Sequence, residues 1–165
     1  MRRFIPVLLS AGLLLTLAGP AAARQSGPTI VEAAIAVNAA SGEFDHLIAA
    51  VVRADLVDEL SANRQLTVFA PTDAAFEALF DALGVDGVAE IPVGLLTTVL
   101  LHHVAPGERF SGDVLGGTRV RMLDKSFTHP RIQGGMPFID DAAIVLPDVD
   151  VANGVIHVID AVLLP

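Results

Sequence analysis

The stretch LTVFAPTDAAFEAL, Leu66–Leu79, places a strand and a helix on either side of one proline. The β-branched and aromatic content of Leu66–Ala70 is typical of a strand, and the proline that follows ends it. Thr72 is suited to cap the next helix, and Asp73 lies in the first turn, where a carboxylate interacts favourably with the helix dipole. The segment therefore predicts a strand joined directly to a helix over residues 74–82.

Apolar residues recur at helical spacing on both sides of this segment. Upstream, residues 29–40 form one predicted helix with a threonine cap, and Leu56–Leu60 forms a short amphipathic one. Between them lies the clearest helix of the chain, whose apolar stripe falls at i, i+3, i+4, i+7 and i+8. The stripe consists of Phe44, Leu47, Ile48, Val51 and Val52. Downstream, a helix from Pro92 runs into a histidine pair and ends at Pro106–Gly107.

Beyond residue 107 the composition changes to short β-rich runs separated by glycine and proline. The predicted strands cover Arg119–Leu123, Ser126–Ile132, Ala143–Leu146 and Val155–Leu164. Because helices come mainly first and strands mainly last, the pattern favours the α+β class over a doubly wound sheet. The sequence contains no internal repeat, so we expect one domain over residues 29–165.

The first 23 residues have the pattern of a secretory signal peptide. Arg2 and Arg3 form a basic start, an apolar stretch runs from Ile5 to Ala18, and small residues precede a cleavage point near Ala23. The apolar stretch has 14 residues, fewer than the roughly 20 that a membrane-spanning helix needs. We therefore expect a secreted or periplasmic protein without a membrane span, with residues 24–28 as a polar linker.

Charge and composition limit the classes of partner and of chemistry. The formal net charge is −9, and removal of the two leader arginines leaves −11. Such a charge repels phosphate backbones and anionic lipid, so we expect no nucleic-acid partner. The absence of cysteine removes thiol nucleophiles and thiolate metal ligands, and no phosphate-binding glycine loop or G-x-S-x-G motif is present. We therefore expect neither a cofactor nor an enzyme.

The stretch LLHHVAPG, Leu100–Gly107, raises the question of a metal site, a catalytic base or a packed histidine pair. His103 shares a helix face with apolar residues at helical spacing, whereas His102 points about 100° away from that face. Adjacent histidines cannot easily bind one metal, because zinc helices place their histidines at i and i+4. We interpret His103 as buried, neutral and hydrogen-bonded, joining the helix end to Thr72–Asp73. A ligand-binding or catalytic role stays the alternative.

Two acidic segments suggest further sites. DVDVANG, Asp148–Gly154, lacks the ligands that an EF-hand loop requires, so the sequence predicts no calcium site there. Asn153–Gly154 is instead typical of a tight turn between strands. Asp160 is predicted to lie in a strand, where a carboxylate on an apolar face requires a partner.

Three segments, in order, resemble the signature boxes of fasciclin domains. Leu66–Leu79 resembles the first box, Leu100–Gly107 resembles the central Tyr-His box, and NGVIHVIDAVLLP, Asn153–Pro165, resembles the closing box. Their order and spacing match those of the family, and the resemblance covers the chain from about Thr29 onward.

The resemblance implies a wedge of β-strands in two packed sheets flanked by several helices. It also implies cell adhesion, or association with a protein or glycan of a matrix or cell surface, without catalytic activity. In animal relatives the central box is linked to receptor binding, so the implied binding residues are His102, His103 and Val104, with histidine at 102 in place of the usual tyrosine. The implied structural residues, which fasten turns and strands, are Thr72, Asp73, Phe76, Asn153, Gly154, His157 and Asp160.

A different class of function stays open beside this one. The chain is alternatively a small ligand-binding protein or enzyme of the cell envelope that uses His46, His102 or His103. In either case we expect a monomer.

Overall fold

The computed structural model describes residues 27–165, so the predicted signal peptide and all but two residues of the predicted linker lie outside the described part. The described helices are α1 (Ile30–Ser41), α2 (Asp45–Arg53), α3 (Val57–Ser61), α4 (Asp73–Leu83), the short 3-10 helix η1 (Val88–Glu90), α5 (Val93–His102) and α6 (Ser111–Gly116). The described strands are β1 (Leu66–Pro71), β2 (Val104–Pro106), β3 (Val120–Arg121), β4 (Phe127–Thr128), β5 (Pro130–Gln133), β6 (Met136–Ile139), β7 (Ala142–Val151) and β8 (Gly154–Ile159). No helix of this part is long and apolar enough to cross a membrane.

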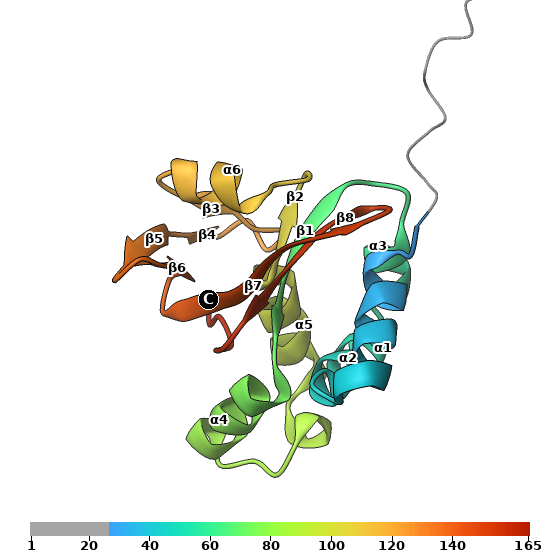
Figure 1. Ribbon diagram of the computed structural model, residues 1–165. Helices are drawn as coiled ribbons and strands as arrows, with labels where there is room; N and C mark the ends of the chain where they lie inside the picture. The colour runs from blue at the N-terminus through green and yellow to red at the C-terminus, as the bar shows by residue number, and fades with distance from the viewer. Residues whose placement is uncertain (1–26) are drawn as a thin grey trace, which may run out of the picture.

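The strands form one mixed sheet and a small ribbon. The sheet has the order β2-β1-β8-β7-β6-β5, and β3 pairs only with β4. β1 and β8 run parallel, while β2 and β7 run antiparallel to them on either side. Figure 1 shows α1, α2 and α3 on one side of this sheet, with β3 to β6 and α6 at the opposite end. The α+β class is therefore confirmed, and the expected second sheet is the two-stranded ribbon.

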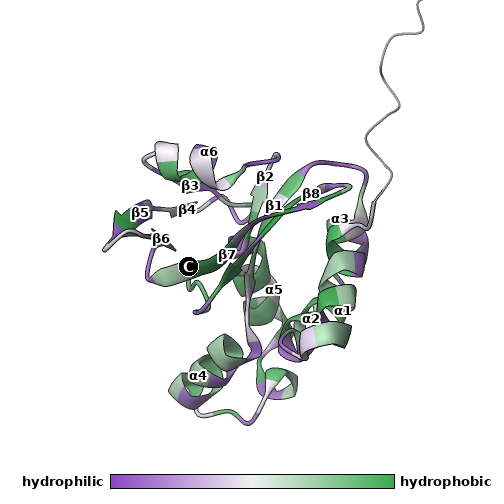
Figure 2. Ribbon diagram, in the orientation of Figure 1, coloured by the Kyte–Doolittle hydropathy of each residue, from purple (hydrophilic) through white to green (hydrophobic). Residues whose placement is uncertain are grey.

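The core lies on both faces of β1 and β8, because every residue of these two strands is buried. Val68 and Ala70 pack toward the helices α1 and α2, whereas Phe69 packs with residues of β6, β7 and α6 on the other face. Figure 2 shows hydrophobic residues along α1, α5 and the central strands, and hydrophilic ones gathered at the connections. The alternation along β1 thus separates two hydrophobic clusters.

Several predicted helices and strands differ from the observed ones in their ends, and the predicted strand Ser126–Ile132 is two strands, β4 and β5, in different sheets. α5 ends at His102 and not at Pro106–Gly107, because the next residues pair with the edge of β1, with Val104 opposite Val68. The last strand ends at Ile159 and not at Leu164. The structure also contains α6 and β6, which the sequence pattern did not predict.

Candidate functional site

The two histidines of the central segment lie at the C-terminus of α5, and both are buried, with 3% of His102 and 2% of His103 exposed. Val104, the first residue of β2, is buried beside them. None of these three side chains forms part of the open surface. A direct contact with a partner therefore requires a rearrangement of this region.

The His103 ring is held at both nitrogens by backbone groups. Nδ1 lies 2.7 Å from the carbonyl oxygen of Val99, and Nε2 lies 2.9 Å from the backbone nitrogen of Leu163. Since a carbonyl only accepts and an amide N–H only donates, Nδ1 carries the proton and Nε2 accepts. Burial lowers the pKa of His103 to about 4. The ring is thus neutral at pH 7 and joins α5 to the C-terminal segment.

This arrangement corrects one sequence-based interpretation of His103. Its stripe position predicts a buried ring, and the ring is buried. The predicted partner, the segment Thr72–Asp73, is wrong, because the bond goes to Leu163. The chain turns back after β8 and brings the backbone of residue 163 to the end of α5, which a helix pattern does not reveal.

The His102 ring is bonded to a turn that follows β3. Its Nδ1 lies 2.9 Å from Asp124 Oδ2 and 2.6 Å from Ser126 Oγ, and this hydroxyl lies 2.5 Å from Asp124 Oδ1. Burial raises the pKa of Asp124, but the hydrogen bonds from Ser126 and His102 outweigh it and lower the pKa below its ordinary value. The helix spacing predicts that His102 points about 100° away from the face of His103, and its ring is nevertheless buried because this turn covers that side of α5.

Ser126, His102 and Asp124 are of the residue types found in a hydrolase triad, but they do not have the geometry of one. A triad uses one imidazole nitrogen for the acid and the other for the serine, so that a proton passes through the ring. Here the carboxylate and the hydroxyl both meet Nδ1 of the same ring. The arrangement fastens a turn to a helix, and because acid and serine share one ring nitrogen, it provides no relay of a proton through the imidazole from serine to acid.

The polar residues of the first segment fasten two helices together. Thr72 caps α4, with its Oγ1 3.4 Å from the backbone nitrogen of Ala75. The carboxylate of Asp73 accepts hydrogen bonds from the backbone nitrogens of Asp45 and His46, at 3.1 and 2.8 Å. These are the first two residues of α2, so Asp73 caps a helix other than its own. Phe76 on α4 is buried.

Asn153 and Gly154 join the closing segment to three others. Asn153 Oδ1 accepts from the backbone nitrogen of Ile30 at 2.8 Å, and its Nδ2 donates to the carbonyl oxygen of Leu60 at 2.7 Å. The side chain thus links the start of α1 to the end of α3. Gly154 lies against β1 so closely that an added Cβ would meet the carbonyl oxygen of Leu66 at 1.8 Å. Only glycine fits there.

His157 is fully buried on β8 and has the tautomer opposite to that of His103. Its Nδ1 accepts from the backbone nitrogen of Asp148 at 3.1 Å, and its Nε2 lies 3.0 Å from the carbonyl oxygen of Arg109, so Nε2 carries the proton. Burial lowers the pKa of His157, and the bond to Arg109 and the charge of Asp148 only partly oppose this. A neutral ring therefore joins β8 to β7 and to the segment between β2 and α6.

Asp160 follows β8 and lies on the surface, contrary to its predicted place within a strand. Its Oδ1 accepts from the backbone nitrogen of Ala143 at 2.7 Å. The backbone nitrogen of Asp160 still donates to the carbonyl oxygen of Ala143 at 3.1 Å, so the carboxylate accepts where the carbonyl oxygen of residue 160 would accept in a continued strand pair.

Comparison with known proteins gives a match to this arrangement of segments. A model of the fasciclin domain matches residues 42–165. The chain belongs to the fasciclin domain family. Protein sll1483 of Synechocystis sp. is 39% identical over 144 residues, which cover 87% of this chain and 77% of that protein. The immunogenic protein MPB70 of Mycobacterium bovis is 36% identical over 155 residues, which cover 88% of this chain and 78% of that protein.

The fold of this fasciclin domain also matches a solved structure. A FAS1 domain pair from the insect cell adhesion molecule Fasciclin I aligns with a TM-score of 0.67 and 18% identity, over 83% of this chain and 51% of that chain. This chain therefore spans about half of the pair. Fasciclin-domain proteins are often extracellular and related to adhesion, and they are generally not enzymes.

The third histidine of the alternative hypothesis lies elsewhere in this fasciclin domain. His46, on α2, has its ring edge-on to Phe80 of α4, with centroids 5.1 Å apart. His102 instead contacts the turn after β3, and His103 contacts α5 and the C-terminal segment. The structure does not bring the three rings into one site. Within residues 27–165, no three His, Asp or Glu side chains are grouped so as to hold a metal.

The sequence patterns missed several residues that position these segments. Thr67 is fully buried on β1, and its Oγ1 donates to the carbonyl oxygen of Gly107 at 2.7 Å and accepts from the backbone nitrogen of Arg109 at 2.9 Å. A threonine in a strand is ordinary, so its role has no signal in the sequence. Asp124 and Ser126 have one weak signal, since D-x-S is a common turn pattern in which the side chain bonds the backbone two residues later.

The segment of residues 117–139 has a net positive charge, opposite to that of the whole chain, and its Arg131 is paired with Asp141 just beyond it. Four of the seven Lys and Arg residues in the described part lie within residues 119–131, and Asp124 is the single acid within residues 117–139. Large apolar side chains are exposed in the same segment: Phe127 (43%), Ile132 (66%) and Met136 (50%). The Arg119 guanidinium lies over the Phe127 ring, 4.4 Å from its centroid. We call residues 119–136 the basic corner.

Proposed function

We propose that this fasciclin domain is a non-catalytic binding module, exported to the periplasm or the cell exterior, that associates with a protein or glycan of a cell surface or matrix. The basic corner carries the proposal, because it combines cationic and exposed apolar side chains in a chain of net charge −9. Exposed apolar patches rimmed by polar residues are typical of interaction sites. The partner that fits this corner carries acidic groups.

The polar residues of the three boxes support a binding role over a catalytic one. Their side chains are used in internal bonds: Asp73 to α2, Asn153 to α1 and α3, and His157 to β7 and the segment before α6. A catalytic residue has to reach the substrate with a free donor or acceptor. Of the three histidines of the alternative hypothesis, His103 has both ring nitrogens bonded to the backbone, and His46 and His102 lie in separate places.

The proposal is tested by binding of the purified protein to the envelope fraction of its source cells and to immobilised heparin, an acidic glycan. We expect the double variant Arg119→Glu/Arg131→Glu to lose binding at least tenfold, and added salt to weaken wild-type binding. The matched control is Arg53→Glu/Arg64→Glu, which makes the same charge change on and near the helices α2 and α3. Equal binding by both double variants contradicts the role of the basic corner.

Export is tested separately. We propose cleavage near Ala23, so the intact mass of protein recovered from the periplasm or medium is expected to match a chain that begins at Arg24. A full-length mass in the cytoplasmic fraction contradicts export and leaves the binding test unaffected.

A further inference from the structure

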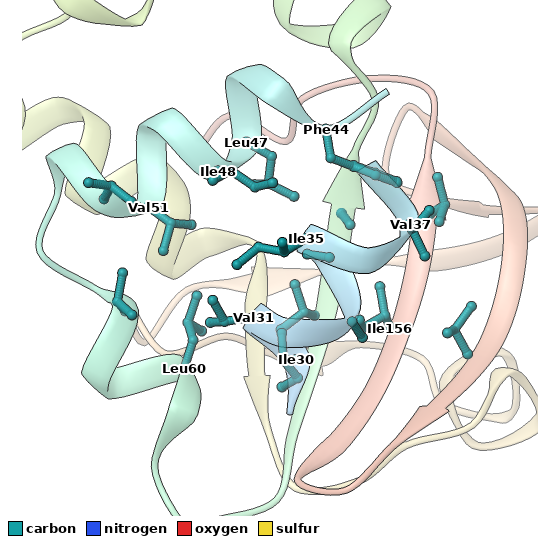
Figure 3. Close-up of a pocket in the computed structure, with 18 of the residues that line it drawn as sticks. Ile30, Val31, Ile35, Val37, Phe44, Leu47, Ile48, Val51, Leu60 and Ile156 are labelled. Carbon is teal, nitrogen blue, oxygen red and sulfur yellow. The ribbon is translucent and has the colours of Figure 1, made fainter. Parts of the chain in front are cut away.

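A hollow of about 180 Å³ lies between α1, α2 and the face of the sheet formed by β1 and β8. Figure 3 shows side chains of both helices and of the sheet converging on it, among them Ile30, Phe44, Leu47 and Ile156. Every residue that lines it is Ala, Val, Leu, Ile or Phe. It lies on the side of the sheet opposite the basic corner (Figure 1).

The hollow follows from the size of the residues in α1. This helix is fixed at its start by Asn153 Oδ1, which accepts from Ile30, and at its end by Asn38, whose Oδ1 accepts from the backbone nitrogen of Phe44 at 2.8 Å. Between these ends α1 presents Ala33 and Ala34 to the hollow. Their methyl groups are too short to fill the space that the fixed ends leave above the sheet.

The chemistry of the lining selects an apolar occupant. A buried water needs two to four polar partners, and an apolar cavity of roughly 150 Å³ stays dry and binds benzene. This hollow is of similar size and has a rim of exposed apolar side chains, with 50% of Ile35, 61% of Val52 and 52% of Leu146 accessible. A hydrocarbon group can therefore enter from solvent and leave a polar end at the rim.

We propose that the hollow is a binding site for the alkyl chain of a small uncharged amphiphile. The lining favours an aliphatic chain, because it consists of methyl-bearing side chains with Phe44 as its one aromatic ring. It favours an uncharged head, because no charged residue of either sign lines the hollow to pair with an ionic group. The site is independent of the basic corner, so the two proposals succeed or fail separately.

The proposal is tested with 1-octanol and the purified protein, by methyl NMR titration with intermolecular contacts measured to Ala33, Ala34 and Ile156. Binding is expected to strengthen about fourfold for each methylene from 1-butanol to 1-octanol. The diol 1,8-octanediol is expected to bind at least tenfold more weakly than 1-octanol, because its second hydroxyl finds no partner in the lining.

Two variants that fill the hollow test whether the ligand binds there. Ala34→Leu fills the hollow and is expected to weaken 1-octanol binding at least tenfold, whereas Ala36→Leu, on the exposed face of α1, is expected to leave it unchanged. Ala70→Val fills the hollow from β1 and provides a second test if the helix variant is poorly folded. Absence of titrating methyl signals, equal binding of the diol, or unchanged binding by both filled variants overturns the proposal.

Discussion

The interior around the buried histidines and the hollow under α1 are built from the same two central strands in opposite ways. Around His103 and His157, polar rings are satisfied at both nitrogens by backbone groups. Under α1 no lining residue has a polar side chain, and the side-chain hydrogen bonds of Asn153 and Asn38 lie toward the two ends of the helix. The hydrogen-bonded histidine rings are tightly surrounded by backbone groups. The apolar interface between α1 and the sheet contains a hollow. His103 and His157, whose side chains suggest a catalytic or ligand-binding role in the sequence, are therefore not accessible to a ligand.

The largest expected effect is that of Gly154→Ala, which tests how tightly the fastened region is packed. The new Cβ would meet the carbonyl oxygen of Leu66 at 1.8 Å, so β1 and β8 have to separate. We expect a loss of more than about 4 kcal/mol of unfolding free energy in urea denaturation, or failure to fold. Gly94→Ala on α5, where nothing lies within 4 Å, is the control and is expected to be neutral or slightly stabilising. Similar stability of the two variants would contradict the close approach.

The second effect is that of Asn153→Ala. The substitution leaves the backbone nitrogen of Ile30 and the carbonyl oxygen of Leu60 without this partner. We expect unfolding free energy to fall by about 3 kcal/mol, since each unsatisfied buried group costs about 1–3 kcal/mol. Asn153→Asp keeps the acceptor but places a buried carboxylate against the carbonyl oxygen of Leu60, so its unfolding free energy is expected to fall at least as much as that of the alanine variant. A loss below 1 kcal/mol would show that the α1 start is held by other contacts.

The third effect concerns pH. The pKa of His103 is about 4 in the folded protein, whereas the unfolded chain has the ordinary value of 6.5. Between these values the unfolded state binds the proton and the folded state does not, so stability falls as pH falls. We expect a loss of about 2 kcal/mol between pH 7 and pH 5 from this ring, and the lowered pKa of His157 adds a loss in the same direction.

His103→Leu isolates the contribution of that ring to the pH dependence. The variant is less stable at every pH, but the decline in its unfolding free energy from pH 7 to pH 5 is expected to be smaller by about 2 kcal/mol. An unchanged decline in urea denaturation would show that the ring already takes up a proton in the folded state.

The smallest effect tests the apolar side of the comparison. Ala34→Leu adds apolar surface within the hollow, so we expect unfolding free energy to rise by about 1 kcal/mol. A loss of stability of similar size would show that the helix and sheet cannot accommodate a longer side chain there.

The sequence predicted the parts of the fold that depend on local pattern. The strand and helix of Leu66–Leu79, the apolar stripe of α2 and the burial of His103 all follow from spacing that is visible in one segment. The partners of these residues were not predictable in the same way. Leu163 lies 60 residues from His103, and its contact with the ring is set by how the chain turns after β8.

The hollow and the basic corner also depend on distant segments. Alanines at 33, 34 and 70 are ordinary residues for a helix and a strand, and the gap appears only when Asn38 and Asn153 fix α1 above the sheet. The basic corner was hidden by the overall charge of −9, which suggested repulsion of acidic partners from the whole molecule. A charge count by segment would have found it.

The central claim is that His103 and His157 are neutral fasteners of the interior, each in one tautomer. The most direct test is two-dimensional 1H–15N correlation of the imidazole rings across a pH titration of the purified protein. We predict that His103 is protonated at Nδ1 and His157 at Nε2, and that His103 stays neutral until the pH approaches about 4. A His103 ring that exchanges between tautomers, or that titrates near pH 6.5, would contradict the account.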